Sequence, residues 1–119
     1  MPLCEFVTNI PDKELPGNLH VKLGELLSEA LGKPPERLSL TVTGGARMWR
    51  AGEDPMASLN IWSFAVFGDP AKNAEYSRVL NDFVVKELAI PAERLVIIFN
   101  DVPPTNVGYK GTIAAPAPK

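Results

Sequence analysis

Hydrophobic residues in the first third of the chain follow the spacing of a helix between two strands. The segment Leu3 to Val7 is typical of a short strand, because turn-forming residues follow it. Apolar residues then recur every three or four positions, as on one face of a helix, at Leu15, Leu19, Leu23, Leu26, Leu27, Ala30 and Leu31. Gly32 suits a helix C-cap, so we predict a helix that ends at about Leu31. Alternating apolar and polar residues from Leu38 to Thr43 predict a second strand.

The second half of the chain shows the same order of elements. Ser58 to Phe67 is rich in β-branched and aromatic residues and predicts a third strand. Asp69 followed by Pro70 is a good N-cap and first-turn pair for a second helix. The apolar face of this helix carries Tyr76, Val79, Leu80, Phe83, Val84 and Leu88. Pro91 ends the helix, and the continuously apolar segment Leu95 to Phe99 predicts a fourth strand.

The two halves align with each other. The stretch LGKPPERL at 31–38 matches LAIPAERL at 88–95, an offset of 57 residues that also superimposes the predicted helices and strands. We predict a tandem β-α-β duplication with pseudo-repeats at about 2–43 and 59–100. Two such units form an α/β (α+β) fold, a four-stranded mixed sheet with two helices on one face.

The apolar pattern of the strands requires more burial than two helices provide. Leu95 to Phe99 is apolar at every position, and the third strand carries Trp62, Phe64 and Val66 opposite Leu59 and Ile61. Both faces of the sheet therefore favour burial. Because the helices cover one face, we predict that a partner subunit covers the other, in a homo-oligomer with cyclic symmetry.

Length, charge and composition exclude several classes of protein. A chain of 119 residues suits one domain, here 1–113, and we expect the Ala/Pro-rich tail at 114–119 to be flexible. The net charge of -2 gives no sign of nucleic-acid binding. Cys4 is the only cysteine and His20 the only histidine, so we expect no disulfide, no metal site and no cofactor. No apolar run is long enough to cross a membrane, and no signal peptide is recognisable, which predicts synthesis in the cytosol.

The opening Met1-Pro2 is a candidate for catalysis. Aminopeptidases remove an initiator methionine that precedes a small residue, which would leave the secondary amine of Pro2 at the terminus. An α-amino group has a pKa of about 7.7 to 8.0, and desolvation lowers it toward the range where general bases work best. The alternative is a proline that merely starts an edge strand.

Several short motifs in register with Pro2 suggest a family. They are Thr8-Asn9 with Pro11, Gly32-Lys33-Pro34-Pro35, Asp54-Pro55, Lys86-Glu87-Leu88 and Asn106-Val107-Gly108-Tyr109. With these motifs the chain resembles the macrophage migration inhibitory factor and D-dopachrome tautomerase family, within the N-terminal-proline tautomerase superfamily. The resemblance runs from residue 1 to about 113. Among family members, the chain most resembles the invertebrate, nematode-type ones.

The resemblance implies a homotrimer with active sites between neighbouring subunits. It implies keto-enol tautomerisation of small aromatic, keto-acid-like substrates of the phenylpyruvate or dopachrome type, with Pro2 as the catalytic base. Lys33 would bind the substrate carboxylate. The other implied substrate-binding residues are Ser63, Phe64, Leu3, Val107 and Tyr109. Each has a plainer reading: Lys33 also suits the C-terminal end of a helix dipole, and Phe64 and Tyr109 also suit core or interface packing.

The chain departs from the family pattern in the pocket. Val96 and Ile98 stand where the best-known member places a tyrosine and an asparagine from the neighbouring subunit. Neither side chain can donate a hydrogen bond, so we predict a more apolar wall and leave protonation to Lys33 or water. Arg37 replaces an aromatic residue and either attracts an anionic substrate or is a solvated surface residue. Met56 and Leu59 replace the family's thiol pair, which excludes redox activity by that route.

Two further roles follow from the resemblance. Family members act as secreted, cytokine-like immune modulators that bind a cell-surface receptor of the invariant-chain type, although they lack signal peptides. We therefore expect a cytoplasmic protein that is also secreted. The alternative to the tautomerase is a receptor-binding cytokine homologue with weak or no tautomerase activity.

Overall fold

The fold is a four-stranded sheet with two helices and a small C-terminal hairpin. A computed structural model describes residues 1–115, so most of the expected tail lies outside the described residues. The main elements are β1 (Leu3–Thr8), α1 (Leu19–Leu31), β2 (Ser39–Thr43), β3 (Ala57–Ser63), α2 (Pro70–Leu88), β4 (Leu95–Asp101), β5 (Gly108–Tyr109) and β6 (Thr112–Ile113). Within residues 1–115, no helix is both long and apolar enough to span a membrane.

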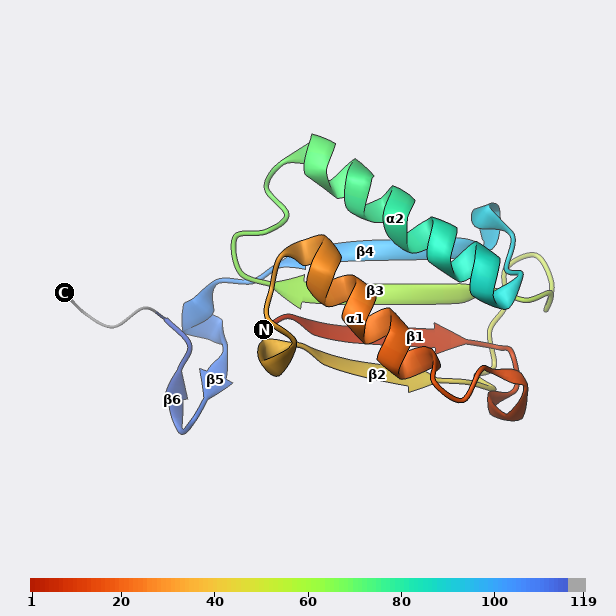
Figure 1. Cartoon of the computed structure of the whole chain (residues 1–119), viewed down its shortest axis with the longest axis horizontal. Coiled ribbons are helices and arrows are strands. Elements are labelled where there is room, and N and C mark those ends of the chain that lie inside the picture. Colours follow the sequence, from red (N-terminus) through yellow and green to blue (C-terminus); the bar gives the residue numbers. More distant parts are fainter. Residues whose placement is uncertain (116–119) are drawn as a thin grey trace.

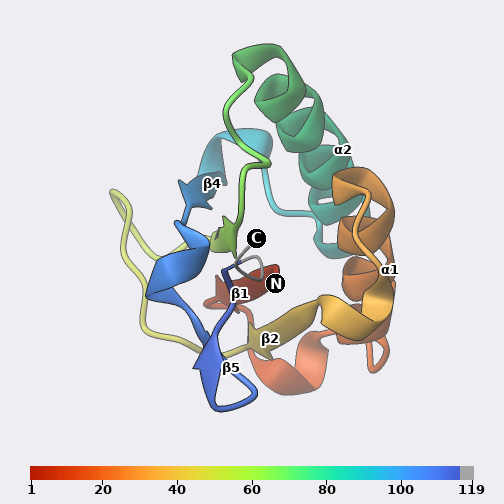
Figure 2. The ribbon, with the colours of Figure 1, turned by 90° about the vertical axis from the view of Figure 1, so that its left-hand side faces the viewer.

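The sheet has the mixed topology that the duplication predicts. Its strand order is β2-β1-β3-β4, with β1 parallel to β2, β3 parallel to β4, and β1 antiparallel to β3. Leu3 lies opposite Ser39 of β2 and Trp62 of β3, so β1 and β2 begin at the end of the sheet where β3 finishes. Both helices cover the same face (Figure 1, Figure 2). The short β5–β6 hairpin lies beyond that same end, close to the N-terminus.

The core lies between this covered face and the helices. Alternate residues of the central strands point into it, and one apolar stripe of each helix completes it. Its fully buried side chains include Phe6, Leu23, Leu27, Leu59, Ile61, Leu80, Val84 and Ile90. Burial of each such side chain contributes about 1.5 to 3 kcal/mol before the entropy of ordering the chain is subtracted. The core therefore fixes the alternation of each strand and the face that each helix presents.

The opposite face of the sheet carries exposed apolar side chains. Val96 and Ile98 are 39% and 44% exposed, whereas the alternating Ile97 and Phe99 pack against the core. Leu3 of β1 is also exposed on this face. The prediction that two helices leave one face of the sheet uncovered is confirmed.

Two of the predicted elements have different boundaries in the structure. The first helix begins at Leu19 rather than Leu15, because Pro16 and Gly17 separate it from a single 3-10 turn at Asp12–Glu14. Leu15 still packs against the core from this connection. The third strand spans Ala57–Ser63 and does not reach Phe67. Ala65 has a left-handed φ of 51° and donates its amide to Asp101 Oδ1 at 2.9 Å, which turns the chain away from the sheet.

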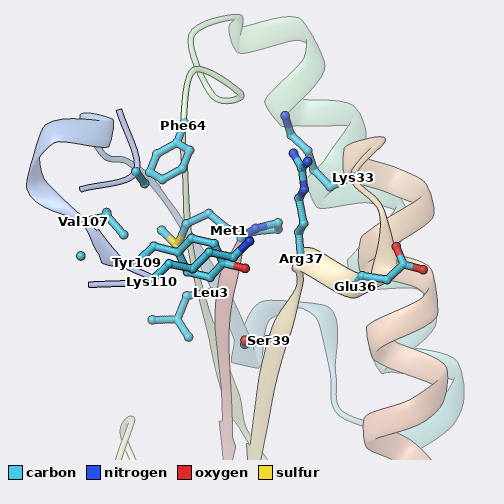
Figure 3. Close-up of a pocket in the computed structure, with 13 residues that line it drawn as sticks. Met1, Leu3, Lys33, Glu36, Arg37, Ser39, Phe64, Val107, Tyr109 and Lys110 are labelled. Carbon is cyan, nitrogen blue, oxygen red and sulfur yellow. The ribbon is translucent and has the colours of Figure 1, made fainter. Parts of the chain in front are cut away.

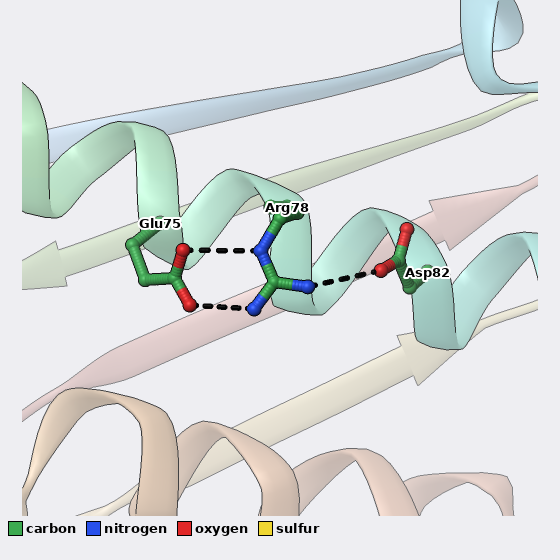
Figure 4. A network of polar contacts seen from close by, with 3 residues as sticks. All are labelled: Glu75, Arg78 and Asp82. Carbon is green, nitrogen blue, oxygen red and sulfur yellow. Dashed lines mark hydrogen bonds and ion pairs between the residues drawn. The ribbon is translucent and has the colours of Figure 1, made fainter.

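The second helix starts and ends as predicted. The Asp69 carboxylate accepts a hydrogen bond from the Ala71 amide at 2.9 Å, and Pro70 occupies the first turn. Along its exposed surface Arg78 bridges Glu75 and Asp82 (Figure 4), with the shortest N–O distance, 2.6 Å, to Glu75. The hydrogen bond from Arg78 holds the pKa of the Glu75 carboxyl below its ordinary value. Such exposed pairs add little to stability.

The long connection between β2 and β3 is fastened to the sheet by two polar side chains. The Arg94 guanidinium donates to the carbonyl oxygens of Arg50, Asp54 and Pro55 at 2.9 to 3.0 Å. Asn9 Nδ2 donates to the carbonyls of residues 53 and 54, and Asn9 Oδ1 accepts from the amide of residue 56. Backbone groups that lack a sheet partner are satisfied in this way.

Candidate active site

Pro2 is held at the beginning of the sheet rather than in a frayed terminus. It is fully buried, and its carbonyl accepts a hydrogen bond from the Ser39 amide at 3.0 Å. This bond continues the parallel ladder in which Leu3 lies opposite Ser39. Met1 precedes it and is only partly covered. The first residues therefore have a fixed place at the end of β1.

Lys33 is positioned by the end of α1. Gly32 has a φ of 65°, the left-handed conformation that glycine adopts without strain. The Lys33 amide then donates to the Ser28 carbonyl at 3.0 Å, and the Ser28 hydroxyl donates to the Lys33 carbonyl. The backbone of Lys33 is thus fastened at both polar groups. Its ammonium group stays free to extend toward the end of the sheet where Pro2 lies.

Arg37 approaches the same place from the next turn. It ends the 3-10 helix Pro35–Arg37, and its amide donates to the Pro34 carbonyl at 3.0 Å. This turn connects α1 to β2 and places Arg37 two residues before Ser39, the partner of the Pro2 carbonyl.

The C-terminal hairpin supplies the opposite wall. The 3-10 turn Pro104–Asn106 leads into Val107, whose carbonyl accepts from the Ala114 amide at 2.8 Å. Tyr109 and Lys110 lie at the tip of the hairpin, with Lys110 Nζ 5.4 Å from the centre of the Tyr109 ring. This separation is within the range of a cation–π contact.

These segments enclose a cavity of about 600 Å³. Figure 3 shows Lys33 and Arg37 on one side of it, with Phe64, Val107, Tyr109 and Lys110 on the other. Its lining comprises Met1, Pro2, Leu3, Lys33, Glu36, Arg37, Ser39, Phe64, Val107, Gly108, Tyr109, Lys110 and Ala114. Residues from four separate parts of the chain therefore meet around Pro2.

Most of the site residues expected from the sequence come together here, but three do not. Pro2, Leu3, Lys33, Phe64, Val107 and Tyr109 all line the cavity. Ser63 does not: it is 1% exposed at the end of β3, and its hydroxyl has no hydrogen-bond partner within residues 1–115. Val96 and Ile98 lie on the open face of the sheet, outside the cavity of their own chain.

Several lining residues were not anticipated from the sequence. Glu36 and Ser39 flank Arg37 in the connection to β2, and Lys110 follows Tyr109 in the hairpin. Adjacency to a predicted residue is the only signal that could have suggested them. Arg37, for which a solvated surface position was the alternative, also lines the cavity.

The cavity disfavours positive charge at the terminus. Burial lowers the pKa of the Met1 ammonium group from its ordinary value of 8.0, and the nearby Arg37 and Lys33 lower it further. Cys4, two residues from Pro2, has the opposite shift: burial raises the pKa of its thiol to about 12, although the nearby N-terminus opposes this. An amine at this end of β1 is thus driven toward its basic form, while the thiol is kept neutral.

The family model described as macrophage migration inhibitory factor (MIF) matches residues 1–115. The chain belongs to this family. It is 34% identical to the MIF-like protein mif-2 of Caenorhabditis elegans over 120 aligned positions, covering 100% of this chain and 99% of the relative. It is 39% identical to D-dopachrome decarboxylase of Gallus gallus, covering 95% and 97%.

Solved structures of the MIF family have the same fold. The macrophage migration inhibitory factor of Oncomelania hupensis superimposes with a TM-score of 0.90 at 25% identity, covering 96% of this chain and 82% of that one. The factor from Trichinella spiralis gives a TM-score of 0.88 at 23% identity, covering 93% and 98%. The names of the relatives describe a D-dopachrome decarboxylase, which is a lyase, and a factor that inhibits the migration of macrophages.

Proposed function

We propose that this MIF-family protein is a keto-enol tautomerase that uses the N-terminal amine of Pro2 as its base. Its substrates would be small keto acids of the phenylpyruvate type or compounds of the dopachrome type. One observation carries the proposal: Pro2 borders a cavity that it shares with the cation of Lys33. A base and an anion-binding group facing one space are what proton abstraction next to a carbonyl needs.

The chemistry would run as a proton transfer within one substrate. Lys33 binds the carboxylate and orients the adjacent carbonyl toward the terminus. The unprotonated Pro2 nitrogen removes a proton from the carbon next to that carbonyl, and an enolate forms. The same proton, held on the Pro2 nitrogen, is then delivered to the enolate oxygen, which completes the enol. Phe64 and Tyr109 would flank the aromatic part of the substrate.

This reaction requires removal of Met1. While Met1 is attached, the Pro2 nitrogen is a tertiary amide and has no basicity. The lowered pKa of the Met1 amine shows what the surroundings do to a positive charge at this end of β1. A Pro2 amine in the same surroundings would be unprotonated in a larger fraction of molecules at neutral pH.

We further propose a trimer in which a neighbouring subunit completes each site. The open sheet face carries Val96 and Ile98, which this chain cannot place in its own cavity. In a ring of three copies these side chains would form an apolar far wall. Proton delivery would then depend on Pro2, Lys33 or water.

Turnover measured on protein of verified N-terminal mass tests the proposal. Chain that begins at Pro2 should interconvert enol and keto forms of phenylpyruvate, and chain that retains Met1 should not. Pro2→Gly should lower kcat/KM by about 100-fold or more, the usual effect of losing a positioned base. The sedimentation coefficient of each form should stay the same, which separates lost chemistry from lost assembly.

Product analysis separates tautomerisation from decarboxylation, because some relatives are named decarboxylases. With D-dopachrome, a tautomerase product keeps its carboxyl group, whereas a decarboxylase releases one carbon dioxide for each turnover. Equal turnover with and without Met1, or absence of turnover in processed protein, would refute Pro2 as the base.

A receptor-binding role is the second candidate, and Trp49 favours it. This side chain is 77% exposed on the connection between β2 and β3, and exposed tryptophans are enriched in binding hot spots. We propose a protein ligand of a cell-surface receptor, which would act outside the cell. A receptor ligand would keep its affinity for the receptor in the Pro2→Gly variant and lose it in Trp49→Ala. Tautomerase turnover should instead be lost in Pro2→Gly and kept in Trp49→Ala.

A further inference from the structure

The cavity is unusually rich in positive charge for a site that binds one carboxylate. Within residues 1–115, three cationic side chains line it, Lys33, Arg37 and Lys110, against the single carboxylate of Glu36. The chain as a whole has a net charge of -2, so the excess is local. An excess of one sign in a concave site concentrates ligands of the opposite sign.

The three cations come from two sides of the cavity. Lys33 and Arg37 lie at the end of α1 and in the turn that follows, whereas Lys110 lies at the tip of the hairpin (Figure 3). Glu36 extends away from Met1 and Tyr109 in the same view. Both Lys33 and Arg37 lower the pKa of the Met1 amine, Arg37 more strongly, so both charges act at the place where Pro2 meets the cavity.

None of the three cations is neutralised within residues 1–115. The ion pairs of the described chain join Lys22 to Glu87, and Arg78 to Glu75 and Asp82, all on the helices. One substrate carboxylate can pair fully with one cation, and the proposed function assigns that role to Lys33. The guanidinium of Arg37 then keeps a planar set of donors that suits a second carboxylate.

We infer that this site prefers substrates with a second anionic group, that is, keto acids carrying a further carboxylate. The inference rests on the proposed function and names the substrate class of the same site. Arg37 is the specificity-determining residue: it binds the second carboxylate while Lys33 binds the one next to the reacting carbonyl. Lys110 adds to the attraction from the opposite wall.

A matched pair of substrates tests this: phenylpyruvate and 4-carboxyphenylpyruvate, which differ by one ring carboxylate. At low ionic strength kcat/KM should be roughly fivefold higher for the diacid, the upper range for a pair with an exposed partner. Arg37→Gln should lower the diacid-to-monoacid ratio by about the same factor, whereas Lys33→Ala should lower both rates. Comparing variants cancels the intrinsic reactivity of the two substrates. Raising the salt concentration should reduce the preference.

Arg78→Gln is the matched control, because it removes the same charge from the outer surface of α2 (Figure 4). It should leave the ratio unchanged. The inference would be overturned if Arg37→Gln kept the diacid-to-monoacid ratio of the unmodified chain. It would also be overturned if Arg78→Gln lowered that ratio as much as Arg37→Gln does, because the effect would then come from net charge alone.

Binding of unreactive acids separates this inference from the proposed function. Terephthalate should bind more tightly than benzoate by calorimetry, and Arg37→Gln should remove most of the difference. If processed protein turns over neither substrate but shows this binding pattern, the tautomerase proposal fails and the dianion preference stands. If processed protein turns over phenylpyruvate but the unmodified chain binds terephthalate no more tightly than benzoate, as does Arg37→Gln, the tautomerase proposal stands and the inference fails.

Discussion

The Ser39 amide donates a hydrogen bond to the Pro2 carbonyl at 3.0 Å, and this bond decides where the chain begins in space. Proline has no amide hydrogen, so it can enter a sheet only through its carbonyl. Here the carbonyl is bound and the residue is buried between β2 and β3. Pro2 is thereby held at the end of the sheet, where it lines the cavity.

We predict that Lys33→Ala lowers kcat/KM for a keto acid by about 10- to 100-fold, because a charge-assisted hydrogen bond to the substrate is lost. Stability should change little, since the end of α1 is fastened through the backbone of Lys33 and through Ser28. Lys33→Arg should recover part of the rate. Lys86→Ala, in the last turn of α2, is the control and should leave turnover unchanged.

The buried thiol of Cys4 makes the protein less stable in alkali. Its pKa is raised to about 12 in the folded chain, while the unfolded thiol ionises near 9.0. Above pH 9 the unfolded state loses a proton that the folded state keeps, so the free energy of unfolding falls as pH rises from 9 toward 12. This contribution is fully present below pH 9. Urea unfolding at pH 8 and pH 10 measures the loss.

The Cys4→Ala variant isolates that effect from other groups that titrate in alkali. It should be less stable at pH 8, because a buried side chain is shortened, but its stability should fall less between pH 8 and pH 10. If the free energy of unfolding fell equally between pH 8 and pH 10 in both proteins, ionisation of Cys4 would not be the cause. Native Cys4 should also react slowly with thiol reagents, since the thiolate is the reactive form.

A methyl group at Gly44 should destabilise the fold, whereas one at Gly24 should not. A Cβ at Gly44 would lie 2.8 Å from the Cα of Asp12, which is backbone and cannot move aside easily. We expect Gly44→Ala to cost about 1 to 3 kcal/mol. At Gly24, within α1, the nearest atom would be 3.9 Å away, and alanine favours a helix by about 1 kcal/mol. Thermal melts of the two variants should shift in opposite directions.

Removal of the Arg94 side chain should loosen the connection between β2 and β3. Its guanidinium satisfies three carbonyl groups of that segment, and Arg94→Ala leaves them without this partner. We expect faster amide hydrogen exchange at 50–55 and a global loss of about 1 to 3 kcal/mol. Arg47→Ala removes a charge from the same connection without these bonds and serves as the control. Unchanged exchange at 50–55 in Arg94→Ala would show that Asn9 alone holds the segment.

A charge on the open sheet face should break the assembly. Ile98 is 44% exposed in the single chain, and Ile98→Asp would place a carboxylate where a second subunit is expected to pack. Sedimentation should show a smaller species than for the unmodified protein. Val21→Asp changes a comparably exposed residue on α1 and should leave the size unchanged. If both variants sediment like the parent, this face is not the interface.

The patterns with a strong local cause were predicted correctly. The spacing of apolar residues identified both helices, and Gly32 and the Asp69-Pro70 pair marked their ends because each has a defined backbone role. The 57-residue repeat indicated two β-α-β units and hence the mixed sheet. Its uncovered face followed from strands that are apolar on both sides, since two helices cover only one. Interactions within a few residues of sequence decide the helices and their ends.

The errors had two different causes, a local interruption of the helix and a contact between distant residues. Leu15 has the right spacing for α1 but packs from a separate turn, since Pro16 and Gly17 interrupt the helix. Ala65 adopts a left-handed conformation that its type disfavours, and the amide that this exposes is satisfied by Asp101, far along the chain. A single sequence carries no local signal for that contact.

The sequence by itself determined the elements, the repeat and the identity of Pro2 and Lys33 as a candidate pair. Only the tertiary structure decided that Arg37 and Lys110 share their cavity, that Ser63 is buried beside it, and that Glu36 extends away. The physical reason is that strand order and helix direction bring four separate segments to one end of the sheet. The excess of positive charge at that end therefore depends on where these segments lie in the fold and not on their order in the chain.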